Sequence, residues 1–182
     1  MFLQPSVVVN GESGNLGCVI SQDELILRRT GWKRNGKRVV FASGAFDLLH
    51  PGHVRLLEQA RSFGDVVVVG IESDAGSRNR RVSSPELLGH GRPVTPSTER
   101  AEIIAALASV DFAVEIDSES LPSFAARLAP HAIVKGGNPG LDKAATPSEK
   151  SSASAPGKLI LIPLEPGHST ARLIERIKNL NA

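Results

Sequence analysis

Short apolar runs alternate along the chain with segments whose apolar residues recur at helical spacing. The apolar runs predict strands at 38–42, 66–71, 112–115, 132–134 and 158–162. The helical spacing predicts helices at 53–63, 97–108, 121–128 and 170–180. Regular alternation of strands and helices is typical of α/β proteins built on a parallel sheet.

The run from Val66 to Ile71 is almost entirely apolar instead of alternating with polar residues. Such a run indicates a central parallel strand that is covered on both faces. We therefore expect an α/β protein with a Rossmann-like, doubly wound, parallel five-stranded sheet and helices on both faces. Ligands of these sheets bind beyond the carboxyl ends of the strands.

The chain outside this pattern divides into three kinds of segment. Residues 1–20 are expected to form a flexible N-terminal arm, and residues 21–37 a helical extension with a short amphipathic helix over Gln22–Arg34. That helix would lean on the core or pair two subunits. The main domain is expected to span 38–182, with loops near the ligand crevice at 77–90 and at the Ser/Ala/Pro-rich segment 143–156.

Composition and charge exclude several partners. The 182 residues, 41% hydrophobic and 22% charged, suit one domain with a full-sized core. A net charge of +2 is too small to indicate a nucleic-acid or membrane partner, and Arg78, Arg80 and Arg81 are expected to solvate a loop. The first 15 residues resemble neither a signal peptide nor an anchor, and Cys18 is the only cysteine, so we expect a cytoplasmic protein.

The segment Ser43–Gly52 is the predicted turn from the first strand of the main domain into a helix. Its end carries His50 and His53, which share one helix face at this spacing. Pro51 suits a first helical turn, and Gly52 lets a ligand approach the backbone. Free N–H groups and the positive end of a helix dipole attract phosphate oxygens. The turn therefore predicts a phosphate site with two imidazole donors.

The histidine pair alone also allows two other interpretations. Two histidines at this spacing are half of a zinc site, although Cys18 is the only cysteine and no Glu stands beside either ring as in His-Glu-x-x-His. The rings could instead be capping or surface residues. Spacing alone does not decide among the three.

The pattern Gly44-x-Phe46-Asp47-x-x-His50-x-Gly52-His53 resembles the signature of the cytidylyltransferase-like nucleotidyltransferase superfamily. Within it, residues from about 21 to 180 are most similar to the adenylyltransferase domains that make ADP-heptose. The resemblance is supported by further segments in the family's order, namely Gly36–Phe41, Glu58–Asp65, Ser73-Asp74, Gly91–Val94, Glu99-Arg100, Val110-Asp111, Val134–Gly137 and Pro166–Thr170.

The resemblance implies that a sugar-phosphate oxygen attacks the α-phosphate of ATP. His50 and His53 would be the catalytic residues, and Mg²⁺ would bridge the phosphates without dedicated protein ligands. The implied nucleotide-binding residues are Ser43, Gly44, Ala45, Phe46, Asp47, Gly52, Lys135, Gly136, Ser169 and Thr170. Further phosphate or substrate contacts would come from Arg61, Asp74, Arg100, Asn138 and His168.

Several of these residues have structural alternatives. Asp47 could hold the turn by accepting backbone N–H groups, and Ser169 with Thr170 could cap the last helix. An isolated lysine at a strand end, such as Lys135, is usually solvated. Arg61 and Arg100 could be partners in surface salt bridges.

The leading interpretation is transfer of AMP from ATP to heptose 1-phosphate, giving ADP-heptose for the lipopolysaccharide core, and pyrophosphate. One alternative is cytidylyl transfer to glycerol 3-phosphate or another small phosphorylated alcohol, although the Arg-Thr-x-Gly-Ile-Ser-Thr-Thr block expected there is absent. Another is a non-catalytic nucleotide-binding domain that partners a separate sugar kinase, which the family departures at Asn138 and Ala171 favour. The family resemblance also implies a homo-oligomer.

Overall fold

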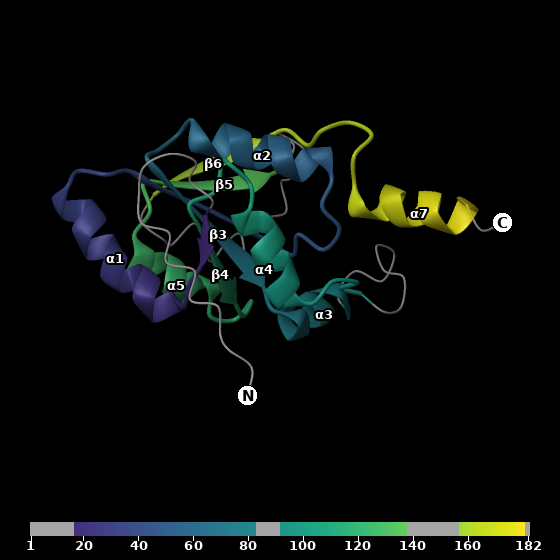
Figure 1. The fold of residues 1–182 in the computed structure, drawn as a ribbon, viewed down its shortest axis with the longest axis horizontal. Helices are drawn as coiled ribbons and strands as arrows, with labels where there is room; N and C mark the ends of the chain where they lie inside the picture. The colour runs from purple at the N-terminus through teal and green to yellow at the C-terminus, as the bar shows by residue number, and fades with distance from the viewer. Residues whose placement is uncertain (1–16, 83–91, 138–156, 181–182) are drawn as a thin grey trace.

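The computed structural model describes residues 17–82, 92–137 and 157–180, and this part of the chain is built around a parallel six-stranded sheet (Figure 1). The strand order is β1-β4-β3-β2-β5-β6. The strands are β1 (Cys18–Val19), β2 (Val39–Gly44), β3 (Val66–Glu72), β4 (Phe112–Ile116), β5 (Ala132–Gly136) and β6 (Lys158–Ile162). The helices are α1 (Gln22–Arg34), α2 (Pro51–Arg61), α3 (Asp74–Val82), α4 (Ser97–Ala105), α5 (Leu121–Leu128) and α7 (Thr170–Leu180).

The doubly wound α/β fold is confirmed, but the expected count of five strands is wrong. Cys18 and Val19 form β1, which pairs in parallel with β4 at the register Cys18↔Phe112. The end of the expected flexible arm is therefore part of the sheet. A strand of two residues is too short to show a periodicity, so the sequence pattern could not predict it.

Helix α3 also corrects an expectation, because its residues overlap the loop predicted at 77–90. The helix begins at Asp74, and its sequence has six polar residues and no apolar stripe before Val82. A segment without such a stripe gives no helical signal in the sequence. The rest of that predicted loop, and the segment 143–156, lie outside the described residues.

Alternating side chains of β2 divide the core between the two faces of the sheet. Val40 and Ala42 belong to one buried cluster, with Leu57 of α2 and Ile104 of α4. Val39 and Phe41 face the other cluster, with Leu25 of α1 and Phe124 of α5. Helices therefore cover both faces, as the apolar run of the neighbouring β3 predicts.

Helix α1 packs on the core, which is one of the two roles expected for it. Leu25 is fully buried, and Trp32 contacts Phe112 of β4 with ring centroids 5.1 Å apart. The Arg29 guanidinium donates to the carbonyl oxygens of Leu128 (2.8 Å) and Ala129 (3.0 Å) at the end of α5. These contacts fix α1 against α5 and β4.

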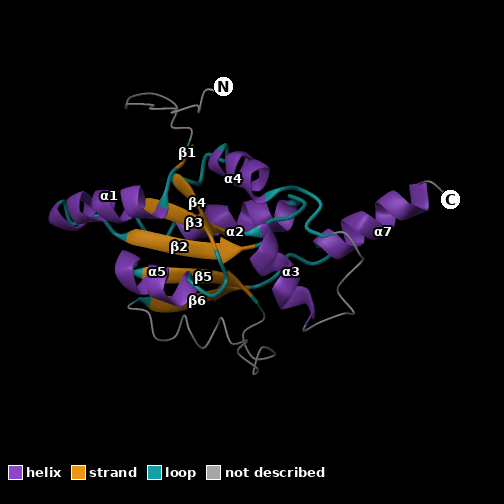
Figure 2. Ribbon diagram, turned by 90° about the horizontal axis from the view of Figure 1, so that it is seen from below, coloured by secondary structure: helices purple, strands orange, loops and turns teal. Residues whose placement is uncertain are grey.

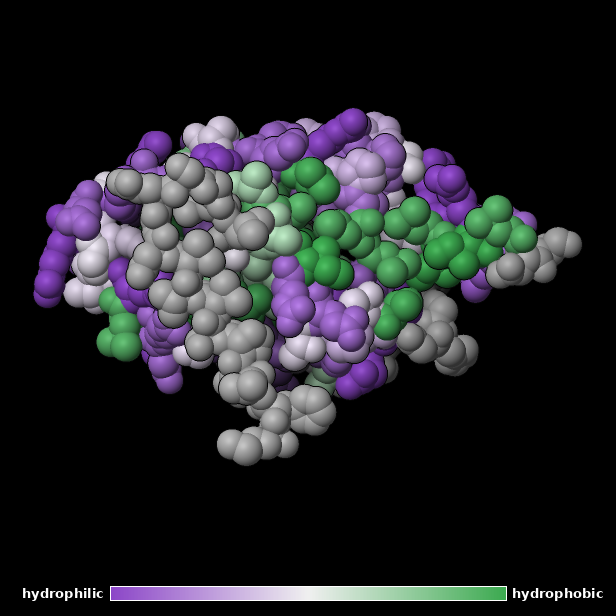
Figure 3. Space-filling model, viewed as in Figure 1, coloured by the Kyte–Doolittle hydropathy of each residue, from purple (hydrophilic) through white to green (hydrophobic). Residues whose placement is uncertain are grey.

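Helix α7 stands away from the sheet, beyond the carboxyl ends of the strands (Figures 1 and 2). None of its residues is buried, and Ile177 and Leu180 are 52% and 83% exposed. Hydrophobic residues continue from the body of the molecule along this helix (Figure 3). Among the described helices, none has the length and apolar character that a membrane crossing needs.

Leu57 should contribute strongly to stability because it lies fully buried between α2 and the sheet. We expect Leu57→Ala to lower the free energy of unfolding by about 2–5 kcal/mol in urea denaturation, since it removes buried methyl groups and leaves a cavity. Leu27→Ala is the matched control, because Leu27 is 76% exposed and should cost less than about 0.5 kcal/mol. Equal losses for the two variants would contradict this packing.

Candidate active site

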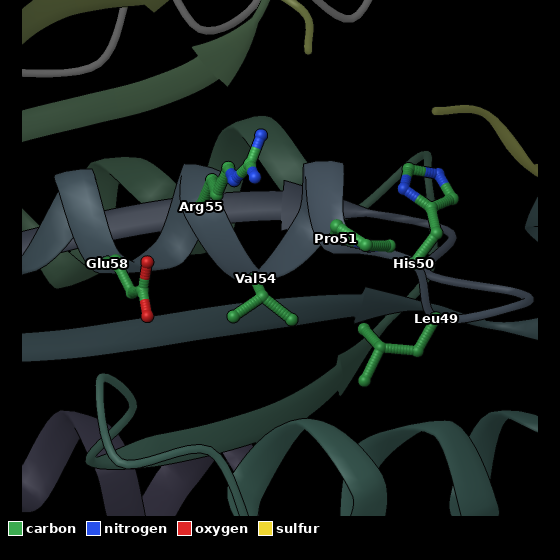
Figure 4. Close-up of a pocket in the computed structure, with 6 residues that line it drawn as sticks. All are labelled: Leu49, His50, Pro51, Val54, Arg55 and Glu58. Carbon is green, nitrogen blue, oxygen red and sulfur yellow. The ribbon is translucent and has the colours of Figure 1, made fainter. Parts of the chain in front are cut away.

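The site is built on the turn between β2 and α2. Strand β2 ends at Gly44, and α2 begins at Pro51 with His50 as its N-cap residue in extended backbone conformation. A pocket of about 450 Å³ opens along the first turns of α2, lined by Leu49, His50, Pro51, Val54, Arg55 and Glu58. His50 and Arg55 point to one side of the helix, and Leu49 and Val54 to the other (Figure 4).

The two histidines of the signature lie against each other, as their spacing predicts. The rings of His50 and His53 are stacked, with centroids 3.8 Å apart and an angle of 19° between their planes. The Nδ1 atoms of both rings are buried and have no hydrogen-bond partner. Buried polar atoms are almost always paired in folded proteins, so two adjacent unpaired atoms at one helix terminus indicate a ligand site.

Both imidazoles are kept neutral near pH 7. Burial, and then the charge of His50, lower the pKa of His53 from 6.5 to about 4. Burial, and then the charge of His168, also lower the pKa of His50. A bound phosphate would oppose both effects because a nearby negative charge favours the protonated ring. The pair is therefore suited to gaining positive charge as an anion binds.

The beginning of α2 presents the positive end of its helix dipole to this anion, while the N–H of His53 already donates to His50 O at 2.9 Å. Its first turn contains no acidic residue, and Pro51 has no N–H to leave unpaired. A Cβ atom at Gly52 would lie 3.0 Å from the ring atoms Cε1 and Nδ1 of His50. Glycine at this position therefore keeps the space beside the ring open.

Asp47 holds the turn rather than pointing outward to a ligand. Its buried carboxylate accepts hydrogen bonds from Arg92 Nε (2.8 Å) and from the N–H groups of Val94 (2.6 Å) and Thr95 (3.2 Å). Burial by itself would raise the pKa of Asp47, but these hydrogen bonds lower it below its usual value. The structural role weighed for Asp47 therefore has direct support.

Arg100 is a buried residue, so its expected role as a phosphate or surface contact does not fit the structure. Its guanidinium donates to Thr95 O at 2.8 Å, to Asp74 Oδ1 at 2.6 Å and to the carbonyl oxygen of Ala45. The side chain has no exposed surface. Asp74 is consequently the ion-pair partner of Arg100 at the start of α3.

Phe46 has a backbone conformation that is rare for a residue with a side chain. Its φ angle is +46°, in the left-handed region that favours glycine. Its ring packs against His53 with centroids 5.2 Å apart. A Cβ atom at Gly44 would lie 3.2 Å from this ring, so the last residue of β2 leaves room for it.

The loop that precedes α7 passes beside the beginning of α2. Glu165 forms an ion pair with Arg55, and its Cβ lies near Gly52. Ser169 caps α7, because its hydroxyl oxygen accepts the N–H of Arg172 at 3.2 Å. His168 is exposed but close enough to influence the pKa of His50. The structure thus brings the Pro166–Thr170 segment to the histidine pair, as the sequence predicts.

Strand β5 ends next to β2, which places Lys135 and Gly136 at the same edge of the sheet. Val134 is paired with Ala42 in the parallel register. The residues that follow them, Lys135 and Ser43, therefore lie at the neighbouring ends of the two strands. A Cβ atom at Gly136 would lie 2.9 Å from Leu164 Cδ2. Glycine at position 136 therefore allows the loop before α7 to approach, and Asn138 lies outside the described residues.

Arg61 does not belong to the site, which corrects its assignment as a phosphate contact. It forms an ion pair with Asp111, whose carboxylate also accepts the N–H of Val67 at 2.7 Å. Val67 is at the start of β3, so Arg61 lies at the amino ends of the strands. Helix α2 runs back along the sheet and carries its last residue away from the phosphate turn.

Metal ligands do not gather around the pair. Within the ranges that the structure describes, no three His, Cys, Asp or Glu side chains are placed to hold a metal ion. The zinc interpretation of the two histidines therefore has no support among these residues.

Comparison with known proteins shows the family of the chain. A family model described as cytidylyltransferase-like matches residues 41–176, which include the turn, the histidine pair and most of α7. The chain belongs to the cytidylyltransferase-like family. The predicted superfamily and the predicted enzyme class, a nucleotidyltransferase, are thereby confirmed.

The similar sequences include proteins named bifunctional protein HldE. The protein of Koribacter versatilis is 39% identical over 158 residues, which cover 87% of this chain and 31% of the relative. The protein of Geobacter sulfurreducens is 41% identical over 145 residues, covering 80% of this chain and 28% of the relative. The chain thus spans about a third of the length of these relatives.

Solved structures show the same fold. The lipopolysaccharide core biosynthesis protein from Thermoplasma volcanium has a TM-score of 0.57 and 25% identity, and the match covers 71% of this chain and 99% of that protein. A pantoate-beta-alanine ligase from Francisella tularensis has a TM-score of 0.56 at 13% identity, covering 87% and 73%. The latter similarity concerns the fold alone.

Sequence reasoning missed three residues that shape the site. Arg92 pairs with Asp47, while Arg55 and Glu165 pair beside the first turn of α2. Arg92 belongs to the Gly-Arg-Pro-Val segment of the family resemblance. That segment indicated a functional role, but it did not indicate an ion pair with Asp47. Arg55 and Glu165 are 110 positions apart, and no periodicity connects them.

The low pKa of His53 should make stability depend on pH. Unfolding takes up a proton at this ring between pH 6.5 and about 4. The contribution of the neutral His53 ring to the free energy of unfolding is therefore full above pH 6.5 and is lost as the pH falls towards 4. We expect His53→Gln to lose less unfolding free energy than the wild type over this range in urea titrations. The same pH dependence in both proteins would show that the ring is not desolvated.

Proposed function

We propose that this nucleotidyltransferase transfers AMP from ATP to heptose 1-phosphate, giving ADP-heptose and pyrophosphate for the lipopolysaccharide core. The observation that carries the proposal is the stacked pair His50 and His53 with unpaired Nδ1 atoms at the start of α2. Similarity to the HldE proteins and to a lipopolysaccharide core biosynthesis protein supports the choice of substrate.

The reaction would need positioning and charge stabilisation more than a general base. A phosphate oxygen of the sugar phosphate attacks the α-phosphorus, and the bond from this phosphorus to the bridging oxygen of the β-phosphate breaks. The attacking oxygen is already anionic near neutral pH. The imidazoles and the positive end of the α2 dipole would stabilise the negative charge on the phosphates in the transition state.

Mg²⁺ is the metal that such a reaction calls for. The described part of the chain has no carboxylate cluster for it, and the His pair is a poor ligand set for a cation that prefers oxygen. Phosphate oxygens and water would therefore supply its ligands, and the ion would offset the charge of the triphosphate.

The supply of sugar 1-phosphate connects this activity to a kinase. The relatives are named bifunctional, and the matched region is only about a third of their length. We propose that a sugar kinase, separate or linked, makes the substrate of the transferase. A homo-oligomeric state stays a prediction.

Pyrophosphate release tests the proposed reaction. Purified protein with Mg²⁺ would be assayed with ATP or CTP, each against heptose 1-phosphate and glycerol 3-phosphate. We expect release with ATP and the heptose alone. Release with CTP and glycerol 3-phosphate instead would overturn the proposed substrates, and ATP binding without release in any pair would indicate a non-catalytic domain.

His53→Ala should separate the role of the histidine pair from folding. Loss of one transition-state donor should lower kcat by about a hundredfold or more, with the thermal unfolding midpoint largely retained. His131→Asn is the matched control, because His131 accepts the N–H of Val39 at the opposite end of the sheet and the new amide oxygen can accept the same bond. Near-normal kcat in His53→Ala would remove the pair from the mechanism.

A further inference from the structure

Two described residues other than glycine have a positive φ angle, Phe46 and Ala129, both at +46°. This conformation is unfavourable for a residue with a side chain and persists only where the surroundings hold it. At Ala129, the Arg29 guanidinium binds the residue's own carbonyl oxygen. At Phe46, the Arg100 guanidinium binds the carbonyl oxygen of the preceding residue, Ala45.

The turn at Phe46 is held on both sides. On one side is Arg100, whose other nitrogens donate to Thr95 O and Asp74 Oδ1. On the other side is the Asp47 carboxylate, bound by Arg92 and by the N–H groups of Val94 and Thr95. Arg100 and the three groups that bind Asp47 all lie within residues 92–100. One segment therefore holds both the residue before Phe46 and the residue after it.

The conformation of Phe46 determines where its ring lies. The ring contacts His53, and His53 stacks on His50. A change of φ towards the ordinary right-handed region would swing this ring away from its place beside Gly44 and His53. The orientation of the imidazoles therefore depends on the backbone at Phe46.

We propose that Arg100 is a positioning residue, whose buried guanidinium holds the left-handed turn at Phe46 and thereby sets the His50–His53 pair toward the reacting phosphate. This proposal rests on the proposed nucleotidyl transfer. Arg100 acts through the turn and not on the substrate, because its side chain has no exposed surface and its three nitrogens already have acceptors.

The first test is Arg100→Lys, which keeps the charge but cannot reach three acceptors in fixed geometry. We expect kcat to fall about 10- to 100-fold while the KM for ATP changes by less than about threefold, since misplacing a donor affects the transition state most. Unchanged kcat in a folded Arg100→Lys protein would overturn the proposal.

Arg29→Lys is the matched control. Arg29 also donates to backbone carbonyls next to a left-handed residue, but it does so between α1 and α5, on the other face of the sheet. We expect Arg29→Lys to lower the unfolding midpoint and leave kcat unchanged. A fall in kcat equal to that of Arg100→Lys would reduce the role of Arg100 to general stability.

A double-mutant cycle with Phe46→Gly tests the route through the turn. Glycine adopts the same φ without strain, so it no longer needs the anchor, although the ring that supports His53 is lost. In this background, Arg100→Lys should lower kcat by less than about threefold. An undiminished effect would show that Arg100 does not act through Phe46.

A measurement without turnover separates this proposal from the proposed reaction. NMR titration of His53 Cε1–H should show its pKa moving from about 4 in the wild type towards 6.5 in Arg100→Lys, because a relaxed turn lets water reach the ring. An unchanged pKa would overturn the positioning role even if no substrate pair reacts. If Arg100→Lys does not fold, Asp47→Asn should produce the same shift by weakening the other anchor.

Discussion

A buried carboxylate and a buried guanidinium connect the turn after β2 to the segment that leads into α4. Arg100 binds the carbonyl oxygen of the residue before Phe46, and Asp47 is the residue after it. Each of these two charged groups is paired with an oppositely charged side chain and with backbone groups. Removing one partner of such a set leaves the other charge buried and uncompensated. The turn leads into α2, and its Phe46 ring packs against His53, which stacks on His50.

The site keeps features that cost stability in the free protein. The Nδ1 atoms of His50 and His53 are unpaired, the two rings are desolvated, and the first turn of α2 has no acidic side chain to offset its dipole. Each of these costs is relieved by a polyanion that accepts hydrogen bonds and brings negative charge. The same arrangement therefore explains why the folded protein tolerates the site and why phosphate suits it.

The sequence predicts elements where a periodicity is long enough to see. Helices over 121–128 and 170–180 and the strand over 158–162 have the predicted bounds, whereas the two residues of β1 and the polar helix α3 carry no pattern. The histidine pair was predicted because its chemistry is local in the sequence. The roles of Arg61 and Arg100 were not predicted, because Arg61 pairs with Asp111, 50 positions away, and Arg100 binds Asp74 and Ala45, 26 and 55 positions away.

The most direct test of the central claim is a crystal structure of the protein with Mg²⁺ and α,β-methylene-ATP, which cannot react at the scissile bond. We expect phosphate oxygens at the beginning of α2, within hydrogen-bond distance of His53 Nδ1 or His50 Nδ1, with Phe46 still in the left-handed conformation. A triphosphate bound elsewhere, or a metal ion held between the two imidazoles, would contradict it.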